Sequence, residues 1–221
     1  IQGQPAILYF TTDGKWIQQG GELVPIEVSK PKSTKSDRPK VELFIWGYCP
    51  YGVQAQGPMA EVAKLLGDYA DFKAVMYYDG HGAYETQQNK IQACIQKLYP
   101  DKYWNYASGF VSDVYPTCSQ SRDIECDKTK SIAVMNAVGI DSVKVLECVE
   151  SEGADLTAAD SALAQSSGVS GSPTLMINGV ITGADRTAEA YKTAVCAAFN
   201  TAPEACGETL DASAAAASGS C

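Results

Sequence analysis

Continuous and periodic runs of hydrophobic residues predict a strand–helix–strand unit between residues 41 and 78. Residues 41–46 (Val-Glu-Leu-Phe-Ile-Trp) form a largely apolar run that is typical of a buried strand. Apolar residues then recur at helical spacing from about 54 to 67, and residues 71–78 predict a second strand. Because a helix joins the two strands, the pattern favours parallel pairing between them.

A helical block is expected to follow this unit. Residues 83–165 predict mostly helix, with breaks at Pro100, Pro116 and Gly139. Such a block lies outside the alternating strand and helix pattern on either side of it. We therefore interpret it as an insertion into a smaller α/β domain.

Beyond the helical block the pattern predicts a β-hairpin and one more helix. A strand at 174–177 is followed by Asn178-Gly179, which favours a tight turn because both residues tolerate positive φ. Val180-Ile181 starts the return strand, and a final helix is expected over about 187–199.

The two ends of the chain have simpler patterns. Strand-like runs at 6–10 and 23–28 flank a Gly20-Gly21 turn, and residues 211–221 are a low-complexity Ala/Ser run. We therefore expect an N-terminal β extension at 1–28, a basic linker at 29–39, a main domain at 40–199, and a disulfide-stapled turn and tail at 200–221.

Charge is unevenly distributed along the chain. The formal net charge is −9 at pH 7, which argues against a nucleic-acid partner. Residues 30–40 nevertheless hold five basic residues against one acid, Asp37. This basic stretch is typical of a solvated linker, and an anionic docking site is the alternative interpretation.

Eight cysteines indicate the compartment of the protein. A chain of 221 residues can bury a core without disulfides, whereas many cysteines without a C-x-x-C pair are typical of an oxidising environment. The sequence begins at Ile1, so we expect a mature form whose signal peptide has been removed. No apolar run approaches the roughly 18 residues of a membrane span. The expected location is secreted or extracytoplasmic, at a cell surface or in a periplasm-like space.

The cysteine spacing is better explained by disulfides than by a metal. None of the spacings is a zinc-knuckle pattern, and a single histidine excludes histidine-rich zinc sites. We expect neither a metal nor a cofactor. The pairs that the spacing favours are Cys94–Cys148, Cys118–Cys126 and Cys196–Cys206, although the sequence leaves other connectivities open. This pairing leaves Cys49 and Cys221 unpaired, with Cys221 as a possible cross-link.

Two motifs stand beside predicted strands. Cys49-Pro-Tyr-Gly52 follows the first strand of the main domain, and Gly168-Val-Ser-Gly-Ser-Pro173-Thr opens the hairpin. They resemble the active-site turn and the cis-proline loop of the DsbA-like branch of the thioredoxin-like superfamily, and the resemblance covers about 41–199. It implies an α/β thioredoxin-like fold with a helical insertion, to which this chain adds the N-terminal β extension and the low-complexity tail.

A third motif is less complete. The run from His81 to Cys94, His-Gly-x-x-Glu-x-x-x-Asn-x-x-x-x-Cys, resembles part of the signature of gamma-interferon-inducible lysosomal thiol reductase. Asp79 and Thr86 stand where that signature has cysteines. His81 could orient a partner near the reactive thiol, because imidazole titrates near neutral pH. The alternative is an ordinary loop histidine with its hydrogen bonds satisfied.

The resemblance implies that Cys49 is a nucleophilic thiol. The unpaired N–H groups and the dipole at the start of a helix favour the thiolate, and Pro50 at the first helical position loses no needed donor. The thiolate would attack a substrate disulfide and form a mixed disulfide. Members with C-x-x-C carry a second cysteine that releases the substrate, but this chain has Gly52 there.

The same resemblance implies a substrate groove beside the thiol. We expect the Ser172–Pro173 peptide bond to be cis, because X-Pro bonds are the place where the cis form is accessible. In this fold the loop offers backbone groups to an extended substrate. An ordinary turn proline is the alternative. Pro50, Tyr51 and Ser172 are the expected supporting residues of the groove.

Three interpretations of Cys49 remain open at this point. It could act as a single catalytic thiol, with an external thiol or the substrate's own second cysteine resolving the intermediate. It could form a structural disulfide within or between chains. It could also be an unused remnant in a scaffold that has changed its role.

Two functions follow from these interpretations. The first is an extracytoplasmic DsbA-like thiol–disulfide oxidoreductase or isomerase that uses Cys49 alone, with protein thiols or disulfides or an external low-molecular-weight thiol as partners. The second is a non-catalytic structural subunit of an extracellular or cell-surface filament, built by self-assembly through N-terminal strand exchange and disulfide cross-links. Strand exchange is physically reasonable because a run such as residues 5–10 can hydrogen-bond to a neighbour's sheet edge.

Overall fold

The computed structural model describes residues 9–10, 16–19, 22–25, 34–213 and 221. The chain divides into two compact units, residues 1–32 and residues 33–221. The described part of the first unit is a three-stranded antiparallel sheet in the order β1-β2-β3. Its strands are β1 (Tyr9–Phe10), β2 (Trp16–Gln19) and β3 (Glu22–Pro25).

The N-terminal sheet differs from the two strands expected at 6–10 and 23–28. The structure has a further strand, β2, which pairs with both β1 and β3. The sequence did not indicate β2 because Trp16-Ile17 is a short apolar run that two glutamines follow. Residues 6–8 and 26–28 of the expected strands, and most of the run at 5–10 expected to exchange with a neighbour, lie outside the described residues.

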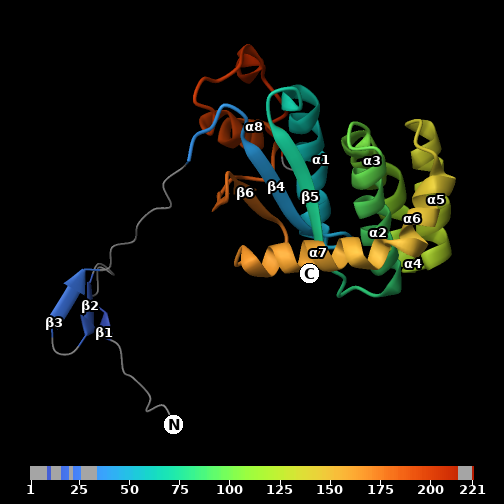
Figure 1. Ribbon diagram of the computed structural model, residues 1–221, viewed down its shortest axis with the longest axis horizontal. Coiled ribbons are helices and arrows are strands. Elements are labelled where there is room, and N and C mark those ends of the chain that lie inside the picture. Colours follow the sequence, from blue (N-terminus) through green and yellow to red (C-terminus); the bar gives the residue numbers. More distant parts are fainter. Residues whose placement is uncertain (1–8, 11–15, 20–21, 26–33, 214–220) are drawn as a thin grey trace, which may run out of the picture. The chain divides into compact units, whose positions relative to one another are not determined.

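The second unit is built on a four-stranded sheet in the order β5-β4-β6-β7 (Figure 1). The central strand β4 pairs in parallel with β5 and antiparallel with β6, and helix α1 (Pro50–Leu66) connects β4 to β5. The parallel pair predicted from the strand–helix–strand pattern is therefore confirmed. The strands are β4 (Lys40–Trp46), β5 (Asp71–Tyr78), β6 (Thr174–Ile177) and β7 (Val180–Ile181).

The hairpin between β6 and β7 turns at the expected pair. Asn178 has φ 50° and Gly179 has φ 77°, the left-handed conformation that a two-residue hairpin turn of this kind requires at both positions. The strands on either side pair antiparallel, Ile177 with Val180. The prediction of a tight turn here is confirmed.

The helical block fills the chain between β5 and β6, and Figure 1 shows helices α2 to α6 gathered at one side of the sheet. The expected break at Pro116 is wrong, because the chain passes from a π-helical turn directly into α4, where proline occupies the start of a helix and loses no needed N–H. The elements are α2 (Ala83–Leu98), α3 (Tyr103–Gly109), the π-helical turn η1 (Phe110–Val114), α4 (Tyr115–Ser121), α5 (Ile124–Ala137), α6 (Ser142–Ser151) and α7 (Gly153–Ser166).

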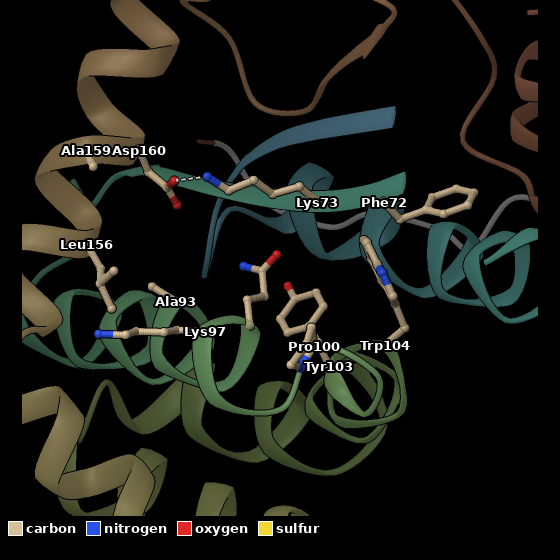
Figure 2. Close-up of a pocket in the computed structure, with 11 residues that line it drawn as sticks. Phe72, Lys73, Ala93, Lys97, Pro100, Tyr103, Trp104, Leu156, Ala159 and Asp160 are labelled. Atoms are coloured by element: carbon tan, nitrogen blue, oxygen red, sulfur yellow. Dashed lines mark hydrogen bonds and ion pairs between the residues drawn. The ribbon is translucent and has the colours of Figure 1, made fainter. Parts of the chain in front are cut away.

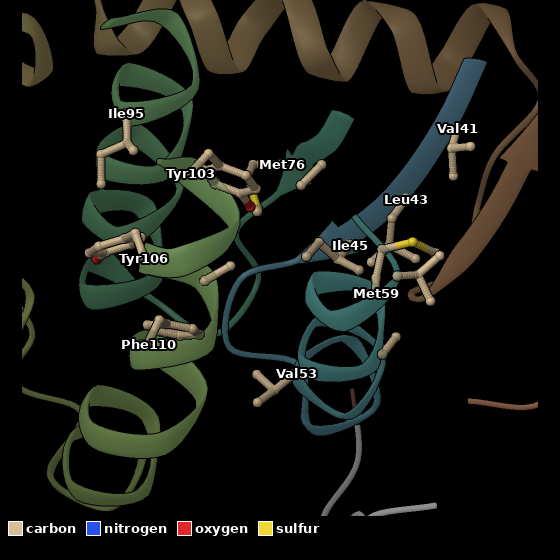
Figure 3. Packing of buried hydrophobic residues seen from close by; sticks show 14 of the residues in the cluster. Val41, Leu43, Ile45, Val53, Met59, Met76, Ile95, Tyr103, Tyr106 and Phe110 are labelled. Atoms are coloured by element: carbon tan, nitrogen blue, oxygen red, sulfur yellow. The ribbon is translucent and has the colours of Figure 1, made fainter. Parts of the chain in front are cut away.

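Side chains of β4 alternate between two hydrophobic clusters. Leu43 and Ile45 belong to the main cluster, which includes Met59 of α1 and continues into the helical block (Figure 3). Phe44 points to the other face and joins Ala164 of α7 in a smaller cluster. The strand is buried on both sides, as its nearly continuous apolar run predicts. Its carboxyl end, at Trp46, leads directly into the turn that contains Cys49.

The basic stretch is attached to the second unit from Thr34 onwards. The Thr34 hydroxyl donates to the backbone carbonyl oxygen of Asn178 at 3.0 Å. The backbone N–H of Ser36 donates to the backbone carbonyl oxygen of Ala198 at 2.9 Å. Arg38 forms an ion pair with Asp71 at 2.6 Å. The described part of the expected 29–39 linker is therefore bound to the domain.

The end of the described chain packs against the last helix, α8 (Ala188–Ala197). A short 3-10 turn η2 (Glu204–Gly207) follows, and the backbone N–H of Leu210 donates to a carboxylate oxygen of Glu189 at 2.8 Å. The chain is thus anchored on α8 up to about Leu210. Among the helices within the described ranges, none has the length and apolar character to cross a membrane.

Candidate functional site

Cys49 lies at the point where the chain leaves β4 and enters α1. It is the N-cap residue of the helix, with extended φ and ψ of −63° and 124°, and Pro50 takes the first helical position. The backbone N–H of Gly52 donates to Cys49 Sγ at 3.4 Å. The side chain is fully buried. The sulfur therefore sits at the positive end of the α1 dipole, shielded from solvent.

Cys49 is not a free thiol in this structure, because its Sγ is bonded to that of Cys221. The pairs expected from the spacing left Cys49 and Cys221 over, and the structure joins these two, so among the interpretations left open for Cys49 it shows a disulfide within the chain. The bond joins residues 172 positions apart, and nothing in the spacing of the cysteines indicates it. Cys221 itself is exposed, so the bond has one buried and one accessible side chain.

The other six cysteines form the three pairs that the spacing favours. Cys94 of α2 is bonded to Cys148 of α6, Cys118 to Cys126 across the junction of α4 and α5, and Cys196 to Cys206 at the end of α8. All eight cysteines of the chain are consequently paired. Four disulfides in one domain are typical of a protein that functions in an oxidising compartment.

The loop before β6 lies against the Cys49 sulfur. The carbonyl oxygen of Ser172 is 3.7 Å from Cys49 Sγ, and the Ser172–Pro173 peptide bond is cis. A disulfide sulfur carries no hydrogen, so this approach is a contact here, and only the reduced thiol could donate to that carbonyl. The Ser172 hydroxyl accepts from the backbone N–H of Trp46 at 3.0 Å. The structure thus brings the two motifs of the sequence together.

Gly52 leaves no room for a second cysteine in the α1 turn. A Cβ atom at this position would lie 2.8 Å from Ser172 Oγ and 2.9 Å from the backbone carbonyl oxygen of Trp46. The latter is main chain within the sheet, which cannot move like the end of a flexible side chain. The glycine is therefore part of the local packing.

The expected groove residues Pro50 and Tyr51 are both half-buried. The Arg186 guanidinium lies over the Tyr51 ring, 5.1 Å from its centroid, and Arg186 Nε donates to Gln54 at 2.7 Å. Arg186 also lines a cavity of about 240 Å³ together with Pro173. This cavity is a concave surface that starts at the proline loop and carries one cationic side chain.

His81 reaches the Cys49 turn indirectly, through Glu85. One oxygen of the buried Glu85 carboxylate accepts from the backbone N–H of Tyr48 at 2.7 Å. The other accepts from the backbone N–H of His81 at 2.8 Å and lies 2.9 Å from His81 Nδ1. Glu85 therefore ties the residue before Cys49 to the start of α2, and the histidine has a satisfied partner.

Tyr48 makes a second buried contact, with Asp127 of α5. The Tyr48 hydroxyl donates to Asp127 Oδ1 at 2.7 Å, and both residues are buried. Burial raises the pKa of Asp127 from 3.8 to about 7, although the hydrogen bonds from Tyr48 and Gln87 act in the opposite direction. Burial, together with the neighbouring Asp127, also raises the pKa of the Tyr48 hydroxyl. The residue next to Cys49 is thus connected to a carboxyl group that titrates near neutral pH.

Sequence reasoning did not assign a role to Glu85, Asp127 or Arg186. Glu85 falls within the motif that begins at His81, so that motif was an available signal for it. Asp127 and Arg186 left no signal of this kind, because Asp127 of α5 and Arg186 of the loop before α8 are distant from the turn in the chain. They are recognised only once the helical block and α8 are placed around α1.

Another cavity of about 300 Å³ lies away from this site, beside β5 and between helices α2, α3 and α7 (Figure 2). Its wall includes Phe72 and Trp104, and an ion pair joins Lys73 to Asp160 at 2.7 Å. Among the described residues that line it, none belongs to the Cys49 turn or to the proline loop. This cavity is therefore separate from the candidate site.

Comparison with known proteins gives matches in structure. No protein-family model and no curated protein sequence matches the chain. The thiol–disulfide oxidoreductase MdbA of Actinomyces oris is similar in structure, with a TM-score of 0.60 and 14% identity over 75% of this chain and 84% of that one. The reduced disulfide-bond oxidoreductase DsbG of Mycobacterium tuberculosis gives a TM-score of 0.57 and 18% identity over 86% of both chains.

A further match is oxidised DsbA of Mycobacterium tuberculosis, with a TM-score of 0.57 and 16% identity over 79% of this chain and 92% of that one. At these identities the likeness concerns the fold. The thioredoxin-like α/β fold with a helical insertion, expected from the two motifs, is confirmed.

Proposed function

We propose that this protein is an extracytoplasmic thiol–disulfide oxidoreductase or isomerase in which Cys49 is the reactive residue. One observation carries the proposal: a disulfide-bonded Cys49 sulfur caps α1 and lies 3.7 Å from the carbonyl of the residue before Pro173. A purely structural disulfide has no need of this position.

The chemistry follows from the position of the sulfur. Once the Cys49 disulfide is opened, the Gly52 N–H and the α1 dipole stabilise a negative charge on Sγ. The thiolate then attacks one sulfur of a substrate disulfide and forms a mixed disulfide, while the other substrate sulfur leaves as a thiolate. The sulfur atoms carry the electrons themselves, so the exchange needs no cofactor.

Substrates are proposed to be protein thiols and disulfides that bind beside Pro173. An extended chain could approach the backbone at Ser172, and its neighbouring side chains would enter the cavity of about 240 Å³ that Arg186 and Pro173 line. Protein substrates of this kind occur in the oxidising compartment that four disulfides favour. Release of the bound substrate needs a thiol from outside the α1 turn, because position 52 is glycine.

A turnover assay tests the proposal. The full chain is mixed with a disulfide-containing peptide and dithiothreitol as the reductant, and the rate of peptide reduction is measured. We expect the wild type to accelerate reduction, and Cys49→Ser to return the rate to that of dithiothreitol alone. The matched control is Cys196→Ser/Cys206→Ser, which removes a disulfide from the end of α8 and should retain the acceleration. A wild type without any acceleration, in either direction of exchange, would refute the proposal.

A structural subunit on the same scaffold is the second candidate, and two observations favour it. Cys49 has no exposed surface, and the N-terminal strands form a compact unit of their own. The pairing of all eight cysteines within the chain does not favour disulfide cross-links between subunits. This candidate therefore depends on strand exchange through the N-terminal unit.

Light scattering of the full chain, with and without residues 1–32, distinguishes this candidate. Under the structural alternative, the full chain forms large assemblies and the truncated chain is monomeric. Under the enzymatic proposal, both chains reduce the peptide at similar rates. A full chain that assembles and shows no Cys49-dependent turnover would favour the structural role.

A further inference from the structure

The candidate site has a nucleophile position but lacks a partner thiol where a C-x-x-C turn would supply one. Gly52 occupies that position, and the carbonyl oxygen of Trp46 lies 2.9 Å from where its Cβ would be. A second cysteine at residue 52 would therefore displace main chain. The turn is built around a single sulfur, and any partner sulfur in this chain must come from elsewhere.

The structure contains such a partner. Cys49 Sγ is bonded to Cys221, the last residue of the sequence. The other three disulfides already pair the remaining six cysteines. Cys221 is accordingly the one thiol of the chain that can form or release a bond with Cys49 without disturbing another pair.

The two cysteines of this bond differ in their exposure to solvent. Cys49 is fully buried, whereas Cys221 is exposed. The exposed partner is therefore the half of this disulfide that lies at the surface. Reduction of this one bond leaves Cys49 as a thiol beside the proline loop and Cys221 as a second thiol.

The described chain is held on the domain ten positions before Cys221. The carbonyl of Asp211 accepts from the backbone N–H of Glu189 at 3.0 Å, so the chain is held on α8 at that residue. Cys221 lies ten positions after Asp211 in the sequence, and ten residues span at most roughly 35 Å when fully extended.

We propose that Cys221 is the resolving cysteine of Cys49, so that a residue far from α1 in the sequence supplies the second thiol that the α1 turn lacks. The inference rests on the proposed function and goes beyond it, because it replaces the external resolving thiol with one in the same chain. Cys49 and Cys221 then constitute a redox pair that carries two electrons.

The reaction balances in both directions. In reduction, the Cys49 thiolate attacks a substrate disulfide, and one substrate sulfur leaves as a thiolate and takes up a proton. The Cys221 thiolate then attacks Cys49 Sγ, which breaks the mixed disulfide and releases the second substrate thiol. The substrate gains two electrons and the Cys49–Cys221 disulfide forms. A small dithiol such as dithiothreitol reduces that disulfide again, and substrate oxidation follows the same steps in reverse.

Trapping of the mixed disulfide tests the inference. Wild type and Cys221→Ser, each pretreated with limiting dithiothreitol and then freed of it, are incubated with a peptide disulfide, and adducts are followed by non-reducing mass spectrometry. We expect Cys221→Ser to accumulate a one-to-one adduct at Cys49 and to release peptide at least about tenfold more slowly than the wild type. The wild type should show little adduct, because Cys221 resolves it.

A relocated thiol controls for loss of the terminal side chain. In Ser220→Cys/Cys221→Ser the thiol moves by one residue, and we expect release to return towards the wild-type rate. Circular dichroism of each variant checks that the fold is retained.

The failures of the two proposals are distinguishable. Release from Cys221→Ser at the wild-type rate would overturn the resolving role and leave Cys49 as a single catalytic thiol. Failure of the relocated thiol to restore release, in a folded variant, would also count against a resolving thiol. The absence of a Cys49 adduct and of turnover in every variant would overturn the proposed function itself.

Discussion

The helical block at residues 83–166 and the start of α1 each contain a buried disulfide cysteine, but the two bonds have different surroundings. Cys94 and Cys148 are both buried and join helices α2 and α6, which pack against each other. Cys49 is buried at a helix N-terminus, and its partner Cys221 is exposed. The first bond joins two packed helices, whereas the second joins a helix N-terminus to an exposed residue 172 positions away in the sequence.

The difference shows that burial of a sulfur does not by itself indicate its role. Cys94 lies within a helix, where the surrounding N–H groups are used in helical hydrogen bonds. Cys49 caps a helix and accepts from the Gly52 N–H, with a backbone carbonyl of the proline loop beside it. The surroundings of Cys49 favour a charged sulfur and an approaching chain, and those of Cys94 favour a permanent bond.

The largest stability effect is expected from the bond in the helical block. Cys94→Ala/Cys148→Ala opens a loop of 54 residues, which should lower the free energy of unfolding by about 4 kcal/mol because the unfolded chain gains entropy. Turnover per folded molecule should stay near that of the wild type. Urea unfolding and the peptide assay measure the two quantities. Loss of turnover in a variant that remains folded would show that the Cys94–Cys148 bond, too, is needed for activity.

Asp127 of the helical block connects the two regions through Tyr48, and its protonation should appear in the pH dependence of stability. Its folded pKa of about 7 is raised from 3.8, so between about pH 4 and pH 7 the folded state holds a proton that the unfolded state has lost. Stability from this group is present below pH 4 and falls as the pH rises to 7.

Asp127→Asn should remove that fall, on the order of 3 kcal/mol between pH 4 and pH 8, because an amide does not titrate and can still accept from Tyr48. Urea unfolding at several pH values gives the slope for wild type and variant. Identical slopes would show that Asp127 does not titrate in this range.

Glu85 is the other connection between the regions. Glu85→Gln replaces one acceptor oxygen by an N–H₂ group, which leaves a buried backbone N–H of Tyr48 or His81 without its partner. We expect the free energy of unfolding to fall by about 2 kcal/mol and the turnover to fall with it. His81→Ala should cost less, about 1 kcal/mol, because the side chain is partly exposed. An equal or larger loss in His81→Ala would make the histidine, and not the carboxylate, the important anchor.

The smallest effect compares two glycines of α1. Gly52→Ala places a Cβ 2.9 Å from the Trp46 carbonyl oxygen, whereas at Gly57 the nearest atom, a Val111 methyl carbon, is 3.7 Å away. Alanine normally stabilises a helix relative to glycine by up to about 1 kcal/mol. Gly57→Ala should therefore raise the melting temperature and Gly52→Ala should lower it. The same sign for both variants would show that the turn has room at residue 52.

Much of the fold was predictable because its signals are local. The apolar run before Cys49, the helical spacing after it and the Asn178-Gly179 turn each specify an element from neighbouring residues. The two motifs then indicated the fold. In contrast, β2 was missed because two apolar residues are too few to produce a recognisable pattern.

The candidate site was predictable only in part, because its contacts join distant segments. Cys49, Ser172 and Pro173 carry recognisable motifs, and the structure brings them together. The bond to Cys221, the contact of Tyr48 with Asp127 and the crowding around Gly52 depend on how helices and loops far apart in the chain are packed. No periodicity or spacing in the sequence reports such contacts.

The most direct test of the central claim, that Cys49 is the redox-active sulfur, is the order in which the four disulfides open. The oxidised full chain is treated with increasing dithiothreitol, alkylated and analysed by peptide mass spectrometry. We predict that Cys49 and Cys221 are modified first, while the other six cysteines remain paired and the domain stays folded. Earlier opening of another pair, or opening of all four together as the domain unfolds, would contradict the account.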